Sequence, residues 1–87
     1  MVHIKEIKFH PKIGEHDYQT KMRFIEKFLK RGDRVKIMMV FRGREITHME
    51  IGRGVLDRII EDAKAYGEVE KMPMNEGRNI ITVLMPK

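Results

Sequence analysis

Two arginines on either side of a glycine are the residues of this sequence best suited to chemistry. Arg42 and Arg44 flank Gly43 where an apolar run of the chain stops. A guanidinium group presents a rigid fork of donors that matches a phosphate group. A capping box, Thr47-x-x-Glu50, follows and predicts a helix start, which also favours an anion. We therefore predict that this corner binds phosphate groups.

Other cations are spaced so that they could join the same surface. Arg23 and Lys27 are one helical turn apart on the exposed side of a predicted helix, and Arg78 lies in the last predicted turn. Contacts of this kind would position the domain on RNA without reading its base sequence. The aromatic stacking platform found on some RNA-binding sheets is not matched, because the strands carry too few aromatic residues.

Positive charge is concentrated in the first half of the sequence. The 87 residues carry a formal net charge of +5 at pH 7. Residues 1–44 hold twelve Lys and Arg against five Asp and Glu, whereas residues 45–87 hold six against eight. Such an uneven basic domain is typical of a protein that binds a polyanion. Charge alone supports equally well a basic surface that serves only solubility.

Residues that could catalyse a reaction or bind a metal are scarce. The sequence has neither Cys nor Ser, which removes two common nucleophiles and any thiolate metal site. The four histidines, His3, His10, His16 and His48, lack the spacing of metal ligands. His48 could reach a phosphate group, although a solvated ring is the simpler interpretation. We expect no catalytic residue, no metal, no cofactor and no enzyme activity.

Strands and helices must position these side chains. Hydrophobic periodicity predicts strands at residues 2–9, 33–41, 68–72 and 79–85, and helices at residues 17–31 and 47–66. Asp17 is expected to cap the first helix and Gly32 to end it. Residues 73–77 are expected to form a turn, because Pro73 and Gly77 disfavour a continuous strand.

The order of these elements predicts one α+β domain over residues 1–87. Right-handed crossovers would place both helices on one face of a four-stranded mixed sheet, giving a two-layer β-α-β-α-β-β domain. The last strand is the most apolar and is therefore expected inside the sheet. The longest apolar run, Ile37 to Phe41, is too short to span a membrane, and no signal peptide is apparent.

Three stretches of the sequence are specific enough to indicate a family. They are KEIKFHPKIGEHDYQTKMRFIEKFLKRGDRVKI, FRGREITHMEIG and EGRNIITVLMPK, of which FRGRE and the closing GRxxxxVLxPK are the most specific parts. With these stretches in the same order and spacing, the chain closely resembles the C-terminal domain of bacterial translation initiation factor 3. The N-terminal domain and the lysine-rich linker of that family are missing from this sequence.

The resemblance implies a function on the ribosome. It implies a domain that binds the small (30S) subunit through 16S ribosomal RNA, prevents association with the large subunit, and supports selection of the initiator tRNA and the start codon. It also implies a cytoplasmic, monomeric protein without enzymatic activity or cofactor. Ribosomal proteins of the platform are further partners that fit the resemblance.

The resemblance also implies RNA-binding residues in several elements. The matching basic positions are Arg23, Arg42, Arg44, Arg58 and Arg78. Position and charge add four lysines to the expected site, namely Lys8, Lys12, Lys21 and Lys27. One position departs from the pattern, because many relatives carry Arg after KEIKF where this sequence has His10. A histidine is mostly uncharged at neutral pH, so that contact is expected to be weaker or pH-dependent.

A protein-interaction module is the alternative interpretation. Met38 and Val40 are predicted on an open sheet face, and Met72 and Met74 lie around the last turn. Methionine often fills gaps in a core, but exposed methionines also form adaptable binding surfaces. Such a surface would bind a ribosomal protein or a partner domain.

Overall fold

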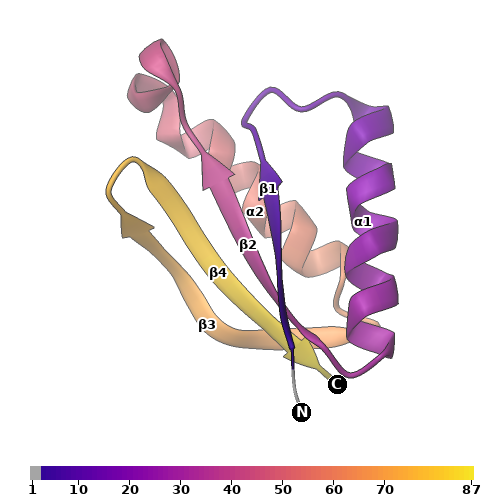
Figure 1. Ribbon diagram of the computed structural model, residues 1–87. Helices are drawn as coiled ribbons and strands as arrows, with labels where there is room; N and C mark the ends of the chain where they lie inside the picture. Colours follow the sequence, from indigo (N-terminus) through magenta and orange to yellow (C-terminus); the bar gives the residue numbers. More distant parts are fainter. Residues whose placement is uncertain (1–2) are drawn as a thin grey trace.

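The computed structural model describes residues 3–87, in which strands and helices alternate (Figure 1). In chain order the elements are β1 (Ile4–Phe9), α1 (Glu15–Lys30), β2 (Arg34–Val40), the 3₁₀ helix η1 (Gly43–His48), α2 (Met49–Asp62), β3 (Gly67–Glu76) and β4 (Asn79–Pro86). Val2, which belongs to the predicted first strand, lies outside the described residues.

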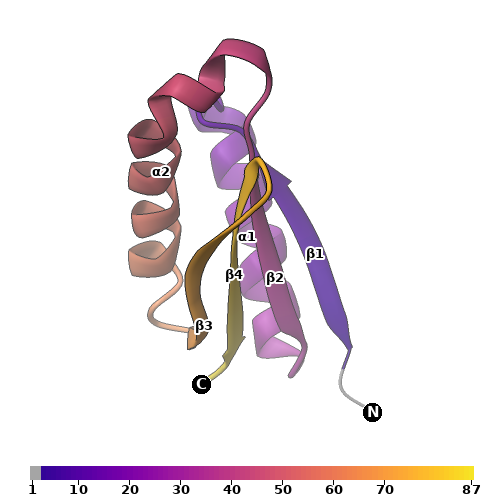
Figure 2. The same cartoon turned by 90° about the vertical axis from the view of Figure 1, so that its left-hand side faces the viewer.

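The strands form one mixed sheet in the order β1-β2-β4-β3. β1 is parallel to β2, and β4 is antiparallel to both of its neighbours, so that β2 and β3 run in the same direction. Both helices therefore connect parallel strands, and crossovers of one hand place them on one face. The sheet lies in front of α2 in Figure 1 and in front of α1 in Figure 2. The predicted α+β fold is confirmed, including the last strand inside the sheet.

One hydrophobic core fills the space between the helices and the sheet. α1 contributes a buried stripe at helical spacing, made of Tyr18, Met22, Ile25 and Leu29. β2 contributes every second residue, namely Val35, Ile37 and Met39, and α2 contributes Gly52, Leu56 and Ile59. Burying a large apolar side chain stabilises a fold by about 1.5–3 kcal/mol. These stripes therefore hold both helices on the sheet and determine which polar side chains face outward.

α1 begins two residues earlier than predicted and ends close to the predicted residue. The expected cap at Asp17 is wrong, because the N-cap is Gly14 and Asp17 lies in the first turn of the helix. A carboxylate in the first turn still interacts favourably with the positive end of the helix dipole. Gly32 follows the helix with a φ of +93°, a conformation that favours glycine, and its N–H donates to the carbonyl of Leu29 at 3.0 Å.

The chain turns sharply between β2 and α2. Gly43 has a φ of +54°, and the carboxylate Oε1 of Glu45 accepts the backbone N–H of Arg42 at 2.9 Å. This hydrogen bond joins Arg42, the residue just before η1, to the first turn of η1. The sequence predicts a strand exit and a turn here, which is what the structure shows, but it does not predict a 3₁₀ helix.

η1 includes Thr47 and His48, the first two residues of the predicted second helix. The expected capping box at Thr47 and Glu50 is wrong, because the hydroxyl of Thr47 donates to the carbonyl of Arg44 at 2.7 Å. α2 itself runs from Met49 to Asp62 instead of covering residues 47–66. The N-cap of α2 is His48, no side chain caps that helix, and the hydroxyl of Thr47 belongs instead to the preceding turn of η1.

β3 is longer than predicted and passes through Pro73. The expected turn at residues 73–77 is wrong, because β3 continues to Glu76 and pairs with β4, and the chain reverses only at residues 77–78. The register against β4 shifts before and after Lys71. Proline has no N–H to donate, but an edge strand with irregular pairing tolerates it.

Candidate nucleic-acid interface

The predicted phosphate corner is exposed at one end of the sheet. The side chains of Arg42 and Arg44 both lie on the surface, one at the end of β2 and one in η1. Phe41, between Arg42 and β2, is buried and fixes the corner against the core. The two guanidinium groups therefore extend from an anchored segment of the backbone.

Two further predicted cations lie at the same end of the molecule. Val40 pairs with Asn79 in the antiparallel register, so Arg78 at the β3–β4 turn lies beside the exit of β2. Lys12, in the loop after β1, lines a pocket together with Arg44. All of these segments lie toward the upper end of the molecule in Figure 1. We call Lys12, Arg42, Arg44 and Arg78 the basic end.

The cations of the basic end carry their charge toward solvent. All four side chains are exposed, and none forms an ion pair within residues 3–87. Exposed cations that come from separate segments raise the local positive potential. Because they have no carboxylate partner in the described chain, no ion pair has to be broken before they bind an anion. The arrangement is therefore suited to an extended polyanion.

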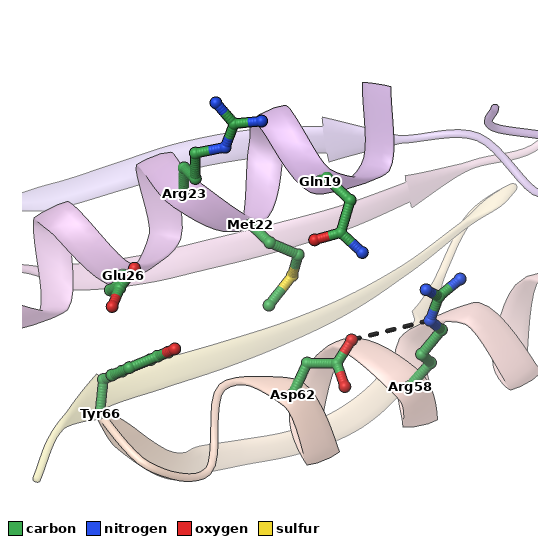
Figure 3. Close-up of a pocket in the computed structure, with 7 residues that line it drawn as sticks. All are labelled: Gln19, Met22, Arg23, Glu26, Arg58, Asp62 and Tyr66. Carbon is green, nitrogen blue, oxygen red and sulfur yellow. Dashed lines mark ion pairs between the residues drawn. The ribbon is translucent and has the colours of Figure 1, made fainter. Parts of the chain in front are cut away.

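Arg23 and Arg58 form a second group in a groove between the helices. They line a cavity of about 380 Å³ together with Tyr66, which lies at the opposite end of the close-up from Arg58 (Figure 3). Arg23 is exposed and makes no ion pair in the described part of the chain, whereas Arg58 is bound on several sides. The sequence and the resemblance do not distinguish these two arginines, but their surroundings do.

Arg58 joins the two helices. Its guanidinium donates to both carboxylate oxygens of Glu15 at 3.0 and 2.8 Å, which makes a bidentate contact between α2 and α1. Its Nε lies 3.6 Å from Asp62 Oδ2, and its Cζ lies 4.0 Å from the centroid of the Tyr18 ring. Bidentate and stacked contacts are those for which arginine is better suited than lysine. Arg58 thus has a structural role that does not need a nucleic acid.

The same contacts shift the ionisation of the neighbouring groups. The hydrogen bonds from Arg58 and then Gln19 lower the pKa of Glu15 to about 2. Burial, and the hydrogen bond that its hydroxyl donates to Asp62 at 2.5 Å, raise the pKa of Tyr18 above its usual value. The bond to Glu15 raises the pKa of Arg58. At neutral pH the pair of Arg58 and Glu15 is fully charged, and Tyr18 acts as a donor.

The remaining predicted lysines do not gather at the basic end. Lys8 is exposed on the sheet face opposite the helices, in register with Met38. The ammonium of Lys21 lies 5.4 Å from the centroid of the Phe9 ring and donates to the carbonyl of Lys8. Lys27 is exposed on α1, one turn after Arg23. The predicted site is therefore spread over at least two surfaces.

Several partners of the predicted residues were not predictable from local sequence patterns. Glu15 lies 43 residues from Arg58 along the chain, and Tyr18 lies 44 residues from Asp62, so no helical or strand period connects them. Ile51 lines the pocket with Lys12, and the signal in the sequence that could have indicated it is an isoleucine that lies outside the buried stripe of its helix.

Within residues 3–87, no group of three or more His, Asp or Glu side chains is arranged to hold a metal ion. None of the helices in that part of the chain has both the length and the apolar character needed to cross a membrane. The prediction of no metal site rests on the sequence alone. The positions of the described His, Asp and Glu side chains do not suggest such a site.

Comparison with known proteins identifies the family. The family described as translation initiation factor IF-3, C-terminal domain, matches residues 2–87. Similar proteins named translation initiation factor IF-3 occur in Ralstonia nicotianae (46% identical, covering 100% of this chain and 49% of the relative), Leptospira biflexa (44%, 99% and 46%) and Xanthobacter autotrophicus (47%, 100% and 50%). The chain thus spans about half the length of these relatives. The names describe a translation factor and not an enzyme, and the chain belongs to the family of IF-3 C-terminal domains.

Proposed function

We propose that this chain binds the small (30S) ribosomal subunit through 16S ribosomal RNA, prevents its association with the large subunit, and supports selection of the initiator tRNA and the start codon. Membership of the family supports a role in translation initiation. The observation that carries the proposal is the basic end, whose four exposed cations come from three segments and have no ion-pair partner within residues 3–87.

The mechanism we propose is occlusion. Guanidinium and ammonium groups bind phosphate groups of the RNA and position the domain, because phosphate contacts fix orientation without reading the bases. A domain seated in this way occupies surface that the large subunit would otherwise contact. It acts in the cytoplasm as a monomer, and ribosomal proteins of the platform are secondary contacts.

The test is to remove two charges from the basic end and measure binding to small subunits. The double substitution Arg42→Ala and Arg44→Ala should weaken binding at moderate salt, leave the thermal unfolding temperature nearly unchanged, and reduce the inhibition of subunit association. The guanidinium groups are exposed, so their loss affects the polyanion and not the core. Binding would be followed by sedimentation with purified small subunits.

A matched control removes the same charge from the other end of the helices. Lys30 and Lys64 are exposed near the C-terminal ends of α1 and α2, away from η1. Lys30 pairs with Glu26 at 3.1 Å, but a contact at the surface contributes little to stability. Lys30→Ala with Lys64→Ala should bind small subunits like the unsubstituted chain. Equal affinities for all three proteins would contradict the proposal that the basic end binds RNA.

The alternative function has its own structural support. On the sheet face opposite the helices, Ile4, Met74 and Ile81 line a groove of about 270 Å³. Met72 and Met74 are 70% and 61% exposed, respectively, so apolar area is available to a protein partner. Binding to small subunits that is insensitive to salt, and that is lost on Met74→Ser but kept after the arginine substitutions, would favour a protein-interaction module.

A further inference from the structure

A small pocket adjoins the basic end and differs from it in character. It lies between the loop after β1 and the start of α2, and its volume is about 220 Å³. The residues that line it are Pro11, Lys12, Arg44, Glu45, His48 and Ile51. Both segments are near the upper end of the molecule in Figures 1 and 2. The pocket therefore opens where the proposed RNA surface would be.

Two of the lining residues are apolar. Pro11, in the loop after β1, is buried, whereas Ile51 lies in the first turn of α2 and is 45% exposed. The other apolar residues of α2 at core positions are covered by the sheet, so Ile51 is an apolar side chain that faces outward beside cations. A site for a simple anion would gain nothing from such a wall.

The charged residues around the pocket favour an anion at its rim. Lys12 and Arg44 make no ion pair in the described part of the chain. Glu45 is the one carboxylate that lines the pocket, and its Oε1 is already bound to the N–H of Arg42. The Nδ1 atom of His48 lies 3.7 Å from a carboxylate oxygen of Glu50, outside the pocket lining.

We propose that this pocket binds one unstacked nucleotide of single-stranded RNA, with the base between Pro11 and Ile51 and its phosphate group on Lys12 and Arg44. A nucleotide joins a flat ring, whose face packs on apolar groups, to an anion, and the pocket offers partners for both. A base in a duplex is stacked and paired and cannot enter, so the pocket favours an unpaired segment. The inference rests on the proposed function and specifies that this end of the domain binds an unpaired segment of RNA.

The test shortens the apolar wall without changing the charge. Ile51→Ala should weaken binding of a labelled single-stranded RNA hexamer roughly five- to tenfold, because a base loses part of its packing surface. The dependence of affinity on salt should stay the same, since no cation is removed. Ile46→Ala is the control, because Ile46 is an exposed isoleucine in η1 that does not line the pocket. Fluorescence anisotropy measures both variants.

Two comparisons separate a base site from an anion site. The hexamer should shift the methyl signal of Ile51 in an NMR titration through the ring current of the bound base, whereas inorganic phosphate and the hexamer annealed to its complement should shift that signal much less. Equal binding by Ile51→Ala and Ile46→Ala, or a shift of the Ile51 signal that phosphate alone reproduces in full, would contradict the proposal that the pocket binds a base. If only the pocket fails, the arginine substitutions still weaken binding to small subunits; if they do not, the proposed function fails as well.

Discussion

At the scale of single residues, the two kinds of arginine in this domain have different environments. Arg42 and Arg44 are exposed and unpaired in the described chain, whereas Arg58 is held by Glu15 and Asp62. A phosphate group can bind the first kind directly. It would have to compete with two carboxylates for Arg58, so a loss of binding in an Arg58 variant would report the fold as well as the interface.

The contact between Arg58 and Glu15 leads to a pH prediction. The pKa of Glu15 falls from 4.5 to about 2 on folding, so this carboxylate stabilises the fold fully above pH 4.5 and loses that effect as the pH falls through 2. Glu15→Gln should therefore lower the free energy of unfolding at pH 7, and the difference from the unsubstituted chain should close between pH 4.5 and 2. Urea unfolding at several pH values measures this difference.

Glu61→Gln is the control for this experiment. Glu61 is exposed on α2 and belongs to no ion pair of the described residues. Its substitution should change the unfolding free energy little at any pH. A deficit in Glu15→Gln that persists unchanged at pH 2 would show that the ion pair is not its cause.

At the scale of elements, α2 contains two glycines with opposite surroundings. A Cβ at Gly52 would collide with the buried ring of Phe41, so this glycine permits the close packing of α2 on the sheet. A Cβ at Gly54 would meet no atom within 4 Å. Gly52 belongs to the buried stripe of α2, whereas Gly54 is exposed on another side of the helix.

Replacing each glycine by alanine should therefore shift stability in opposite directions. Gly54→Ala should raise the unfolding free energy by about 0.5–1 kcal/mol, because alanine loses less conformational freedom in a helix. For a domain of this size the melting temperature should rise by roughly 2–8 °C. Gly52→Ala should lower the unfolding free energy by about 1–3 kcal/mol through overpacking. Thermal unfolding followed by circular dichroism tests both, and a destabilised Gly54→Ala would contradict the open surroundings.

At the scale of the whole molecule, the sheet brings together cations that are far apart in sequence. Lys12, Arg42, Arg44 and Arg78 come from the ends of different strands, and the strand order places these ends on one side. Recognition by such a surface is distributed. Loss of Arg42 and Arg44 should weaken docking without abolishing it.

The salt dependence of binding should report how many of these cations contact phosphate groups. Each contact contributes roughly 0.7–0.9 to the slope of log affinity against log salt concentration. Substituting all four cations by alanine should reduce that slope by about 3, and substituting two should reduce it by about half as much. The Lys30 and Lys64 control should keep the full slope. Equal slopes for the variants with two and with four substitutions would show that Lys12 and Arg78 do not contact phosphate groups.

The sequence by itself determined the order of strands and helices, the buried stripes and the family, because these depend on periodicity and on residue types along short stretches. Ile25 belongs to a set of apolar residues spaced at the helical period, and Ile37 belongs to a set spaced at the strand period. The uneven distribution of charge along the chain can also be read directly from the sequence. These features were sufficient to predict the two-layer fold and an interface rich in arginine.

Only the tertiary structure decided which cations are free and which are bound. The pairing of Arg58 with Glu15 and the shared pocket of Lys12 and Ile51 depend on how segments far apart in the chain pack together. The late start of α2 and the passage of β3 through Pro73 depend on competing local hydrogen bonds and on the position of a strand at the sheet edge. Local propensity cannot determine the pairing of Arg58, the shared pocket or the edge position of β3, because their free energies come from partners that the local sequence does not contain. At the start of α2 the competing hydrogen bond is local, but propensity alone does not decide between it and a helix cap.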